Sequence, residues 1–342
     1  MNIGHWVART VAPRAAMIAV AGVFAVSGQA LAAPTELKIG FYQPEAHIFV
    51  KVARDVLPEL EKKTQGRYKF GLYPSEVLGK AAEQIDMTNR GLVFANLICT
   101  CYYPGTFPLF NIETVPIWSG VEGVKAAYEG GLGKLYEEYL HSKGMTNVGY
   151  HGVATYVVRS LGMKKTPVRV PGDLKGQKIR TLGLEQIFAT TNGASVITIP
   201  APDMYEALNR NMIGGVIATE TNWIQWKLQE VLGSITFLDM TASPMSLIYS
   251  ISDMNKIPEA DRKLVLEVLT NYKDTLAAAV DKDVTDSRTW LKTKWKGEAI
   301  FLTPEQKRAM SKSAEAAATK VYLEKTEDFG RKAIAIVKKY NQ

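Results

Sequence analysis

Cysteine and histidine are scarce in this chain of 342 residues, which contains two cysteines and four histidines. Two cysteines cannot build a disulfide-rich scaffold, and the histidines lack the short His and Cys spacings that a zinc site needs. The sequence has no G-x-S-x-G nucleophile motif, and no motif links a histidine to a cysteine nucleophile. Because these motifs are lacking, we expect neither a metal site nor a catalytic centre.

Long apolar runs and a strong charge imbalance are also lacking. Beyond residue 32, no apolar stretch reaches the roughly 20 residues that a transmembrane helix needs. The chain has 41 basic and 34 acidic residues, a net charge of +7, and its positive residues alternate with acids. A nucleic-acid-binding protein would cluster its positive charge, so we expect no nucleic-acid partner. A diffuse positive field suits an anionic small molecule.

The two cysteines lie close together in the apolar segment ANLICTC, as Cys99 and Cys101. In a strand their side chains would point to the same face, at a separation near the upper limit of disulfide geometry. We predict buried free thiols; a disulfide, which an oxidising compartment would permit, is the alternative. A catalytic thiol is the least favoured interpretation.

The first 32 residues have the pattern of a secretory signal peptide. Arg9 and Arg14 precede the apolar stretch AAMIAVAGVFAV, and small residues then lead to Ala32 in an A-x-A pattern. The apolar stretch is too short to span a bilayer. We predict cleavage after Ala32 and export to the periplasm. No cysteine stands at the cut, so no lipid anchor is expected.

Strand and helix patterns alternate along the rest of the chain, which predicts an α/β fold. The first unit reads as a strand (ELKIGFY), a helix (HIFVKVARDVLPELEKKT), a strand (RYKFGLYP), a helix over about residues 80–89 and a buried strand (LVFANLICTC). The pattern starts again near residue 157, with KGQKIRTLG and VITIP as further strands. PMSLIYSIS resembles a strand that returns to the first unit.

We therefore expect two domains. Residues 33–156 and about 244–285 are assigned to domain I, and residues 157–243 and about 300–342 to domain II. A long helix over about residues 259–296 would span both domains. The sequence shows no flexible linker, so several short crossings would join the domains and form a hinge.

Five segments of the mature chain resemble the DctP family, the solute-binding proteins of tripartite ATP-independent periplasmic (TRAP) transporters. They occur in the order and spacing of that family: ELEKKTQGRYKFGLYPSEVLG, YYPGTFPLFNIETVPIW, PVRVPGDLKGQKIR, IPAPDMYEALNRNMIGGV and NWIQWKLQEV. The resemblance implies a two-domain periplasmic binding protein of type II-like architecture, with a long helix spanning both domains. It also implies an extracytoplasmic receptor that closes a cleft on a carboxylate ligand, needs no cofactor, and delivers the ligand to a small DctQ-type and a large DctM-type membrane subunit.

The resemblance also implies which residues bind the carboxylate. Arg180 matches the family arginine that ends the DLKGxKIR segment and forms a bidentate salt bridge with the ligand. A guanidinium suits this role because its planar fork of donors matches two carboxylate oxygens. The alternative is an arginine that is solvated or paired in the core. Arg159 matches a second family arginine, although its segment YVVRSLG departs from the usual Gly-aromatic-Arg pattern.

Departures from the family pattern follow the segment YEALNRN. Gly214 stands where an aspartate is usual, and the asparagine that contacts sugar acids has no counterpart. Thr219, Asn222 and Trp223 are the expected cleft-facing residues of this loop. Trp223 has a second interpretation, as an anchor that packs in the core at the start of a helix.

Loops that follow strands supply further candidates, because ligands of α/β sheets bind beyond the carboxyl ends of the strands. The candidates are Gln43, His47, Tyr102 and Tyr103. His47 would bond a ligand hydroxyl or cap the following helix. Trp118 is expected to pack rather than bind, and Glu45 would repel a carboxylate.

The aromatic residues and the less polar loop favour an aromatic or compact apolar carboxylate. Two other functions are alternatives to a carboxylate receptor. An exported hydrolase or lyase on the same fold would need a nucleophile with a partnered base, which the sequence does not show. A binding protein for another transporter or for a sensor kinase would have the same sequence features, and only the family resemblance separates it from a TRAP receptor.

Overall fold

The computed structural model describes residues 33–341. The predicted signal peptide and its cleavage after Ala32 lie outside these residues and stay predictions. None of the helices in the described part is both long enough and apolar enough to cross a membrane.

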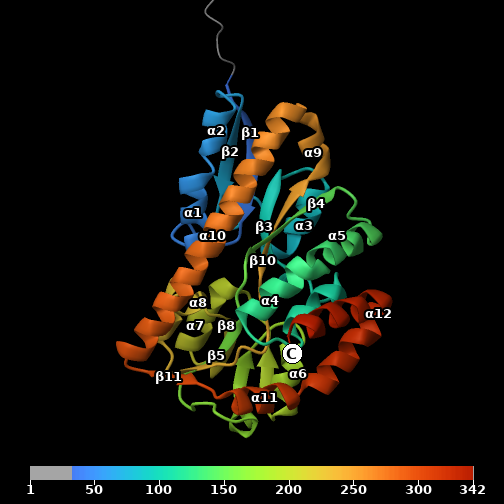
Figure 1. Ribbon diagram of the computed structural model, residues 1–342. Helices are drawn as coiled ribbons and strands as arrows, with labels where there is room; N and C mark the ends of the chain where they lie inside the picture. The colour runs from blue at the N-terminus through green and yellow to red at the C-terminus, as the bar shows by residue number, and fades with distance from the viewer. Residues whose placement is uncertain (1–32, 342) are drawn as a thin grey trace, which may run out of the picture. The chain divides into compact units, whose positions relative to one another are not determined.

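The first sheet contains five strands in the order β2-β1-β3-β10-β4 (Figure 1). β1 is parallel to β2 and β3, whereas β10 is antiparallel to both of its neighbours. The strands are β1 (Thr35–Phe41), β2 (Tyr68–Tyr73), β3 (Ala95–Cys99), β4 (Val148–Thr155) and β10 (Met245–Ser250). The helices between the first three are α1 (Ile48–Val56), α2 (Glu59–Lys63) and α3 (Gln84–Asn89). The predicted alternation of strands and helices is confirmed, as is the return of the chain to this sheet at β10.

The second sheet contains six strands in the order β11-β9-β5-β8-β6-β7. β5 is antiparallel to β8 and β9, and the other neighbouring pairs are parallel. The strands are β5 (Arg159–Met163), β6 (Lys178–Arg180), β7 (Ser195–Ile197), β8 (Gly215–Thr219), β9 (Ser234–Phe237) and β11 (Glu298–Phe301). The helices that connect them are α6 (Glu185–Thr191), α7 (Met204–Asn209) and α8 (Asn222–Gln225). Arg159 begins one strand and Arg180 ends another.

Two chain crossings between the sheets lie side by side. The chain leaves the first sheet after β4 and returns to it between β9 and β10. Val158 and Ala242 form an isolated antiparallel bridge, and the Ser243 amide donates to the Val157 carbonyl at 2.9 Å. The crossings therefore support each other as a short two-stranded ribbon.

The long helix α10 (Glu259–Thr293) packs along elements of both sheets (Figure 1). It contacts α1 and β4 of the first sheet, and β11 of the second. Its buried positions recur at helical spacing and join the apolar core under the first sheet: Val265, Val268, Leu269, Tyr272 and Leu276. The expected helix that contacts both units is present.

The C-terminal segment divides its contacts between the two sheets. Two helices follow β11, namely α11 (Pro304–Lys312) and α12 (Glu315–Tyr340). α12 packs mainly on α4 (Val121–Ala127) and on the 3-10 segment Pro108–Thr114, which belong to the stretch assigned to domain I. β11, by contrast, pairs with β9 in the second sheet. The domain boundaries as such stay a prediction.

The prediction of free thiols at the two cysteines is wrong, because Cys99 and Cys101 form a disulfide. β3 ends at Cys99, and the chain then turns into the 3-10 segment Thr100–Tyr102. This turn brings the two Cα atoms to 5.1 Å, well inside the range that disulfides require. The error came from extending the strand through Cys101.

Candidate functional site

The loop after β1 forms one wall of a small cavity. His47 caps α1, because its Nδ1 accepts a hydrogen bond from the Phe49 amide at 3.3 Å. Burial lowers the pKa of His47 to about 3, so the ring is neutral and carries its proton on Nε2. Its ring lies edge-on to Phe49, with a centroid distance of 4.3 Å, and near Trp226. Of the two predicted roles, capping is observed, and the side chain also lines the cavity.

The cavity has a volume of about 20 Å³, which gives room for a water molecule. Its walls come from the first sheet, from the second sheet and from the crossings between them. The lining residues are Tyr42, Gln43, His47, Phe49, Val157, Ala201, Thr219, Thr221, Asn222, Trp226, Ser243 and Met245. None of these twelve carries a charge, since His47 is neutral.

Gln43 has an unusual environment in this wall. Its side chain is 1% exposed, and within the described residues neither Oε1 nor Nε2 has a partner at hydrogen-bond geometry. The Tyr42 hydroxyl is a polar neighbour: burial raises the pKa of Tyr42, and the Gln43 amide opposes this larger effect in part. The backbone is fixed, because the Gln43 carbonyl accepts from the Ser75 amide at 2.8 Å. An amide that is buried without partners costs free energy, so the side chain is prepared for a partner that the protein itself does not supply.

Arg180 is a buried cation at the end of β6. It is 2% exposed, and it donates from Nε to the Ile199 carbonyl at 2.9 Å and from Nη1 to the Ile217 carbonyl at 3.0 Å. Among residues 33–341 no carboxylate lies at ion-pair distance from it. Burial, and then the nearby charge of Arg159, lower the pKa of Arg180 to about 10. Arg180 still carries its charge at neutral pH, and it is compensated by carbonyl dipoles and by the charge of Glu185, which is not at ion-pair distance.

Arg159, in contrast, has a counter-charge. Its Nε lies 2.9 Å from Oε1 of Glu185, and both side chains are buried, although the N–H is not aligned for a hydrogen bond. Its Nη2 donates to the Ile217 carbonyl at 3.1 Å, so the two arginines share one acceptor. Glu185 also accepts from the hydroxyls of Thr181 and Thr241. The three ionised groups together carry one net positive charge.

The arginines lie directly behind the cavity wall. Arg159 is the register partner of Thr219, a lining residue, in the pairing of β5 with β8. The Tyr102 hydroxyl accepts from the amide of Ala201, another lining residue, at 3.4 Å. Burial raises the pKa of Tyr102, and the charge of Arg180 partly opposes this shift. The cavity, Arg159, Arg180 and Glu185 therefore form one region, called the buried site below.

The loop on the second-sheet side of the buried site is fixed to the long helix. Glu220, 1% exposed, accepts from Nε and Nη2 of Arg288 at 2.6 and 2.7 Å. Arg288 belongs to α10, and its Nη2 also donates to Asp239 in the crossing before β10 at 3.0 Å. Thr219 and Thr221 on either side of Glu220 are thereby held at the cavity. The position of this loop depends on that of α10.

Several sequence-predicted residues meet at the buried site. Gln43, His47, Thr219 and Asn222 line the cavity, and Tyr102 lies edge-on to Tyr42 with a centroid distance of 5.3 Å. Sequence reasoning missed other lining residues, of which Tyr42, Trp226 and Ser243 are examples. Tyr42 precedes a predicted residue in the same loop, so the signal was present. Trp226 and Ser243 could be found only from the fold.

Two predicted residues lie elsewhere. Tyr103 is part of the core around α3, where its hydroxyl accepts from the Ile85 amide at 3.1 Å and donates to the Ala81 carbonyl at 2.8 Å. Trp223 is fully buried and packs over Gly162 in the core of the second sheet. Trp223 therefore lies in the environment of a core anchor. Neither Trp223 nor Tyr103 lines the cavity.

Trp118 and Glu45 also lie outside the smaller cavity. Trp118 is buried, and its Nε1 donates to the Ile112 carbonyl at 3.0 Å, as packing requires. Glu45 is exposed, forms an ion pair with Arg54 and does not line the cavity. Its carboxylate therefore does not repel an anion there.

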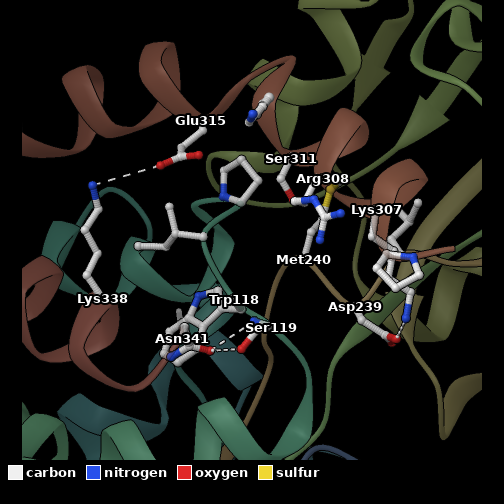
Figure 2. A pocket seen from close by; sticks show the side chains of 15 residues that line it. Trp118, Ser119, Asp239, Met240, Lys307, Arg308, Ser311, Glu315, Lys338 and Asn341 are labelled. Carbon is white, nitrogen blue, oxygen red and sulfur yellow. Dashed lines mark hydrogen bonds and ion pairs between the residues drawn. The ribbon is translucent and has the colours of Figure 1, made fainter. Parts of the chain in front are cut away.

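A larger cavity of about 630 Å³ lies beside α11 and the C-terminal end of α12 (Figure 2). Its charged residues are exposed or paired: Lys307 forms an ion pair with Asp239, and Lys338 lies 4.0 Å from Glu315. Every lining residue that the sequence marked for ligand binding belongs instead to the smaller cavity. The smaller cavity is the candidate site, because a buried arginine without a carboxylate partner among the described residues and the amide of Gln43 are there. In the described part of the chain, no group of three or more His, Cys, Asp and Glu residues is arranged to hold a metal ion.

The family comparison gives a match over residues 39–325 to DctP, the bacterial extracellular solute-binding protein family 7. A solute-binding protein of Albidiferax ferrireducens is 25% identical over 249 residues, which cover 69% of this chain and 70% of that protein. The 2,3-diketo-L-gulonate-binding periplasmic protein YiaO of Escherichia coli is 25% identical over 276 residues, which cover 78% and 82% of the two chains.

A solved structure with the same fold is a TRAP periplasmic solute-binding protein from Desulfovibrio salexigens with bound orotic acid. It has a TM-score of 0.79 at 18% identity, and the match covers 90% of this chain and 98% of that one. The predicted fold class and the resemblance to TRAP receptors are confirmed. The relatives are transport proteins rather than enzymes. The chain therefore belongs to the DctP family of bacterial extracellular solute-binding proteins.

Proposed function

We propose that the protein is the receptor of a TRAP transporter and binds a small organic carboxylate at the buried site, between its two α/β units. The observation that carries this proposal is Arg180, a buried cation beside a cavity, with no carboxylate partner among residues 33–341. An ion that is desolvated without a partner costs several kcal/mol, and an anionic ligand recovers much of this cost. The guanidinium also orients the ligand, because its fork can meet both carboxylate oxygens.

Ligand entry requires the two units to separate. A cavity of about 20 Å³ cannot hold the body of an organic acid, so the arrangement described above corresponds to a closed state. The paired crossings at residues 156–158 and 238–244 form the hinge. α10 packs mainly under the first sheet and is linked to the second unit through Arg288 and Glu220. A ligand favours closure only to the extent that it binds the closed state more tightly than the open one.

The proposed roles of the residues follow from their positions. Arg180 receives the carboxylate, and Arg159, held by Glu185, supports it from the side. Gln43, His47, Tyr102, Thr219 and Asn222 contact the body of the ligand, together with Trp226, which the structure adds. Trp223 and Tyr103 stabilise the walls from within the core.

Two relatives support an acidic ligand by what they bind. The Escherichia coli protein is named for 2,3-diketo-L-gulonate, and the Desulfovibrio salexigens structure contains orotic acid. The membrane partners, a small DctQ-type and a large DctM-type subunit, belong to the same proposal. Its test is uptake into vesicles that contain both subunits, where transport of the ligand should require this receptor and stop when it is omitted.

The test of ligand class is a thermal-shift screen of residues 33–342 against small carboxylic acids, each paired with its primary amide. The amide keeps the shape of the acid and removes the charge. At 100 times its dissociation constant a ligand adds about 2.7 kcal/mol, which raises the melting temperature by several degrees. We expect shifts from acids and none from their amides. Equal shifts from acid and amide would overturn the proposal.

A ligand retained from expression could hide such shifts. The released contents of the denatured protein should therefore be examined by mass spectrometry before the screen. An acid found there would serve as the reference ligand, whereas a neutral compound would contradict the proposed class.

A further inference from the structure

The charge and hydrogen-bonding capacity of the buried site define its ligand more narrowly. We infer that the ligand is a monocarboxylate whose remaining part is uncharged and carries a group that both donates and accepts hydrogen bonds, such as a hydroxyl. This inference rests on the proposed function of Arg180 as the carboxylate anchor.

The charges of the buried site admit one carboxylate. Arg159, Arg180 and Glu185 leave one positive charge, and a single carboxylate neutralises it. Glu220, which is also buried beside the site, is paired with Arg288. Glu113 is a further buried acid near Arg159, and burial raises its pKa to about 7. If Glu113 is ionised, the positive surplus is smaller still. In neither state does the site hold a second positive charge for a second carboxylate.

The walls of the cavity offer no charged side chain to the rest of the ligand. The twelve lining residues include no Lys or Arg, and His47 is neutral. Lys51 acts on His47 from α1, but its side chain is exposed to solvent. Phe49, Val157 and Trp226 contribute apolar surface instead. A second carboxylate in this environment would be desolvated without a counter-charge, which binding cannot easily offset.

The amide of Gln43 requires a hydrogen-bonding group on the ligand. It offers two N–H donors and a carbonyl acceptor, and no described residue bonds to either end. A ligand hydroxyl can accept from Nε2 and donate to Oε1, whereas a hydrocarbon leaves both atoms unsatisfied. A site built to bond a hydroxyl discriminates strongly against an analogue that lacks it, because the buried polar group then stays unpaired.

The test uses matched sets of acids that share a carbon skeleton. One set is propanoate, 2-hydroxypropanoate and propanedioate; another is benzoate, its hydroxybenzoates and its dicarboxylates. Their affinities for residues 33–342 are measured by isothermal titration calorimetry at pH 7.5. We expect one set to contain a hydroxylated monoacid that binds at least tenfold more tightly than both the unsubstituted acid and the diacid.

The variant Gln43→Leu separates the role of the amide from that of the charge. It should lose at least tenfold in affinity for the hydroxylated acid and change less than threefold toward the unsubstituted one. Gln177→Leu is the matched control, because Gln177 is half-buried at a different pocket and does not line the cavity. It should keep the preference of the wild type.

The outcomes distinguish this inference from the proposed function. Tighter binding of a diacid than of every monoacid would overturn the monocarboxylate assignment and leave a carboxylate receptor standing. If Gln43→Leu keeps the preference for the hydroxylated acid, or if the wild type shows no such preference, the role of Gln43 is overturned. If acids of every set fail to bind, the proposed function itself is contradicted.

Discussion

Two cavities of this protein, the one beside α11 and the one at the buried site, differ in a way that volume does not reveal. The larger one, about 630 Å³, is lined by charges that are exposed to water or paired with each other. The smaller one, about 20 Å³, adjoins a buried arginine that has no carboxylate partner in the described part of the chain, and it contains the Gln43 amide, for which no described residue has hydrogen-bond geometry. Such groups cost free energy in the unliganded protein, and a complementary ligand recovers it. The comparison teaches that unsatisfied buried groups mark a binding site more clearly than open space does.

The largest effect should come from breaking the buried ion pair. Glu185→Gln leaves Arg159 and Arg180 together without an anion, and we expect it to lower the free energy of unfolding by about 3–5 kcal/mol. Urea denaturation at pH 7 measures the loss. Glu315→Gln, at the larger cavity, is the control and should cost less than about 1 kcal/mol, because its pair with Lys338 is exposed. Similar losses in both variants would remove the distinction between the cavities.

A second effect concerns pH. Burial raises the pKa of Glu113 from 4.5 to about 7, so the folded protein holds this proton more tightly than the unfolded chain does. The resulting stability is fully present below pH 4.5 and is lost as the pH rises through 7. Relative to Glu113→Gln, the wild type should therefore lose on the order of 3 kcal/mol between pH 4.5 and 8.

Comparison with the variant is needed because His47 and His151 titrate in the opposite sense. Burial lowers the pKa of His47 to about 3 and that of His151 to about 4, so their contribution rises with pH across the acidic range. Both histidines are present in the wild type and in Glu113→Gln, and their effect cancels in the difference. A difference that does not vary with pH would show that Glu113 titrates normally.

The smallest effect should come from the larger cavity. Lys307→Ala removes one of the two cations paired with Asp239 and leaves Arg288 in place. Because Lys307 is about one-third exposed, we expect a loss of less than about 1 kcal/mol in urea denaturation. Affinity for the carboxylate ligand should stay within twofold of the wild type. A large loss of affinity would move the binding site toward this cavity or couple the two.

The elements of the fold were largely predictable from the sequence. Apolar runs identified β1, β3 and β10, and the pattern over about residues 259–296 identified α10, because these segments bury continuous apolar surface. The disulfide was missed because the end of β3 at Cys99 depends on the local turn that follows.

The candidate site was predictable only in part. Gln43 and His47 follow β1 directly, so the rule for ligand positions in α/β sheets found them. The pairing of Glu185 with Arg159, which leaves Arg180 without a partner, joins three different elements and depends on the tertiary fold. The same holds for Trp226, whose neighbour Trp223 faces the core because only one side of the short helix α8 meets the cavity.

The most direct test of the role of Arg180 is calorimetric titration of the best carboxylate into two variants, Arg180→Lys and Arg308→Lys. Both substitutions keep the charge and remove the planar fork, but Arg308 lies at the larger cavity and is exposed. Circular dichroism and thermal unfolding should first show that both variants fold. We predict at least a 100-fold loss of affinity for Arg180→Lys and less than a twofold change for Arg308→Lys. Unchanged affinity in Arg180→Lys would contradict the assignment of Arg180 as the carboxylate anchor.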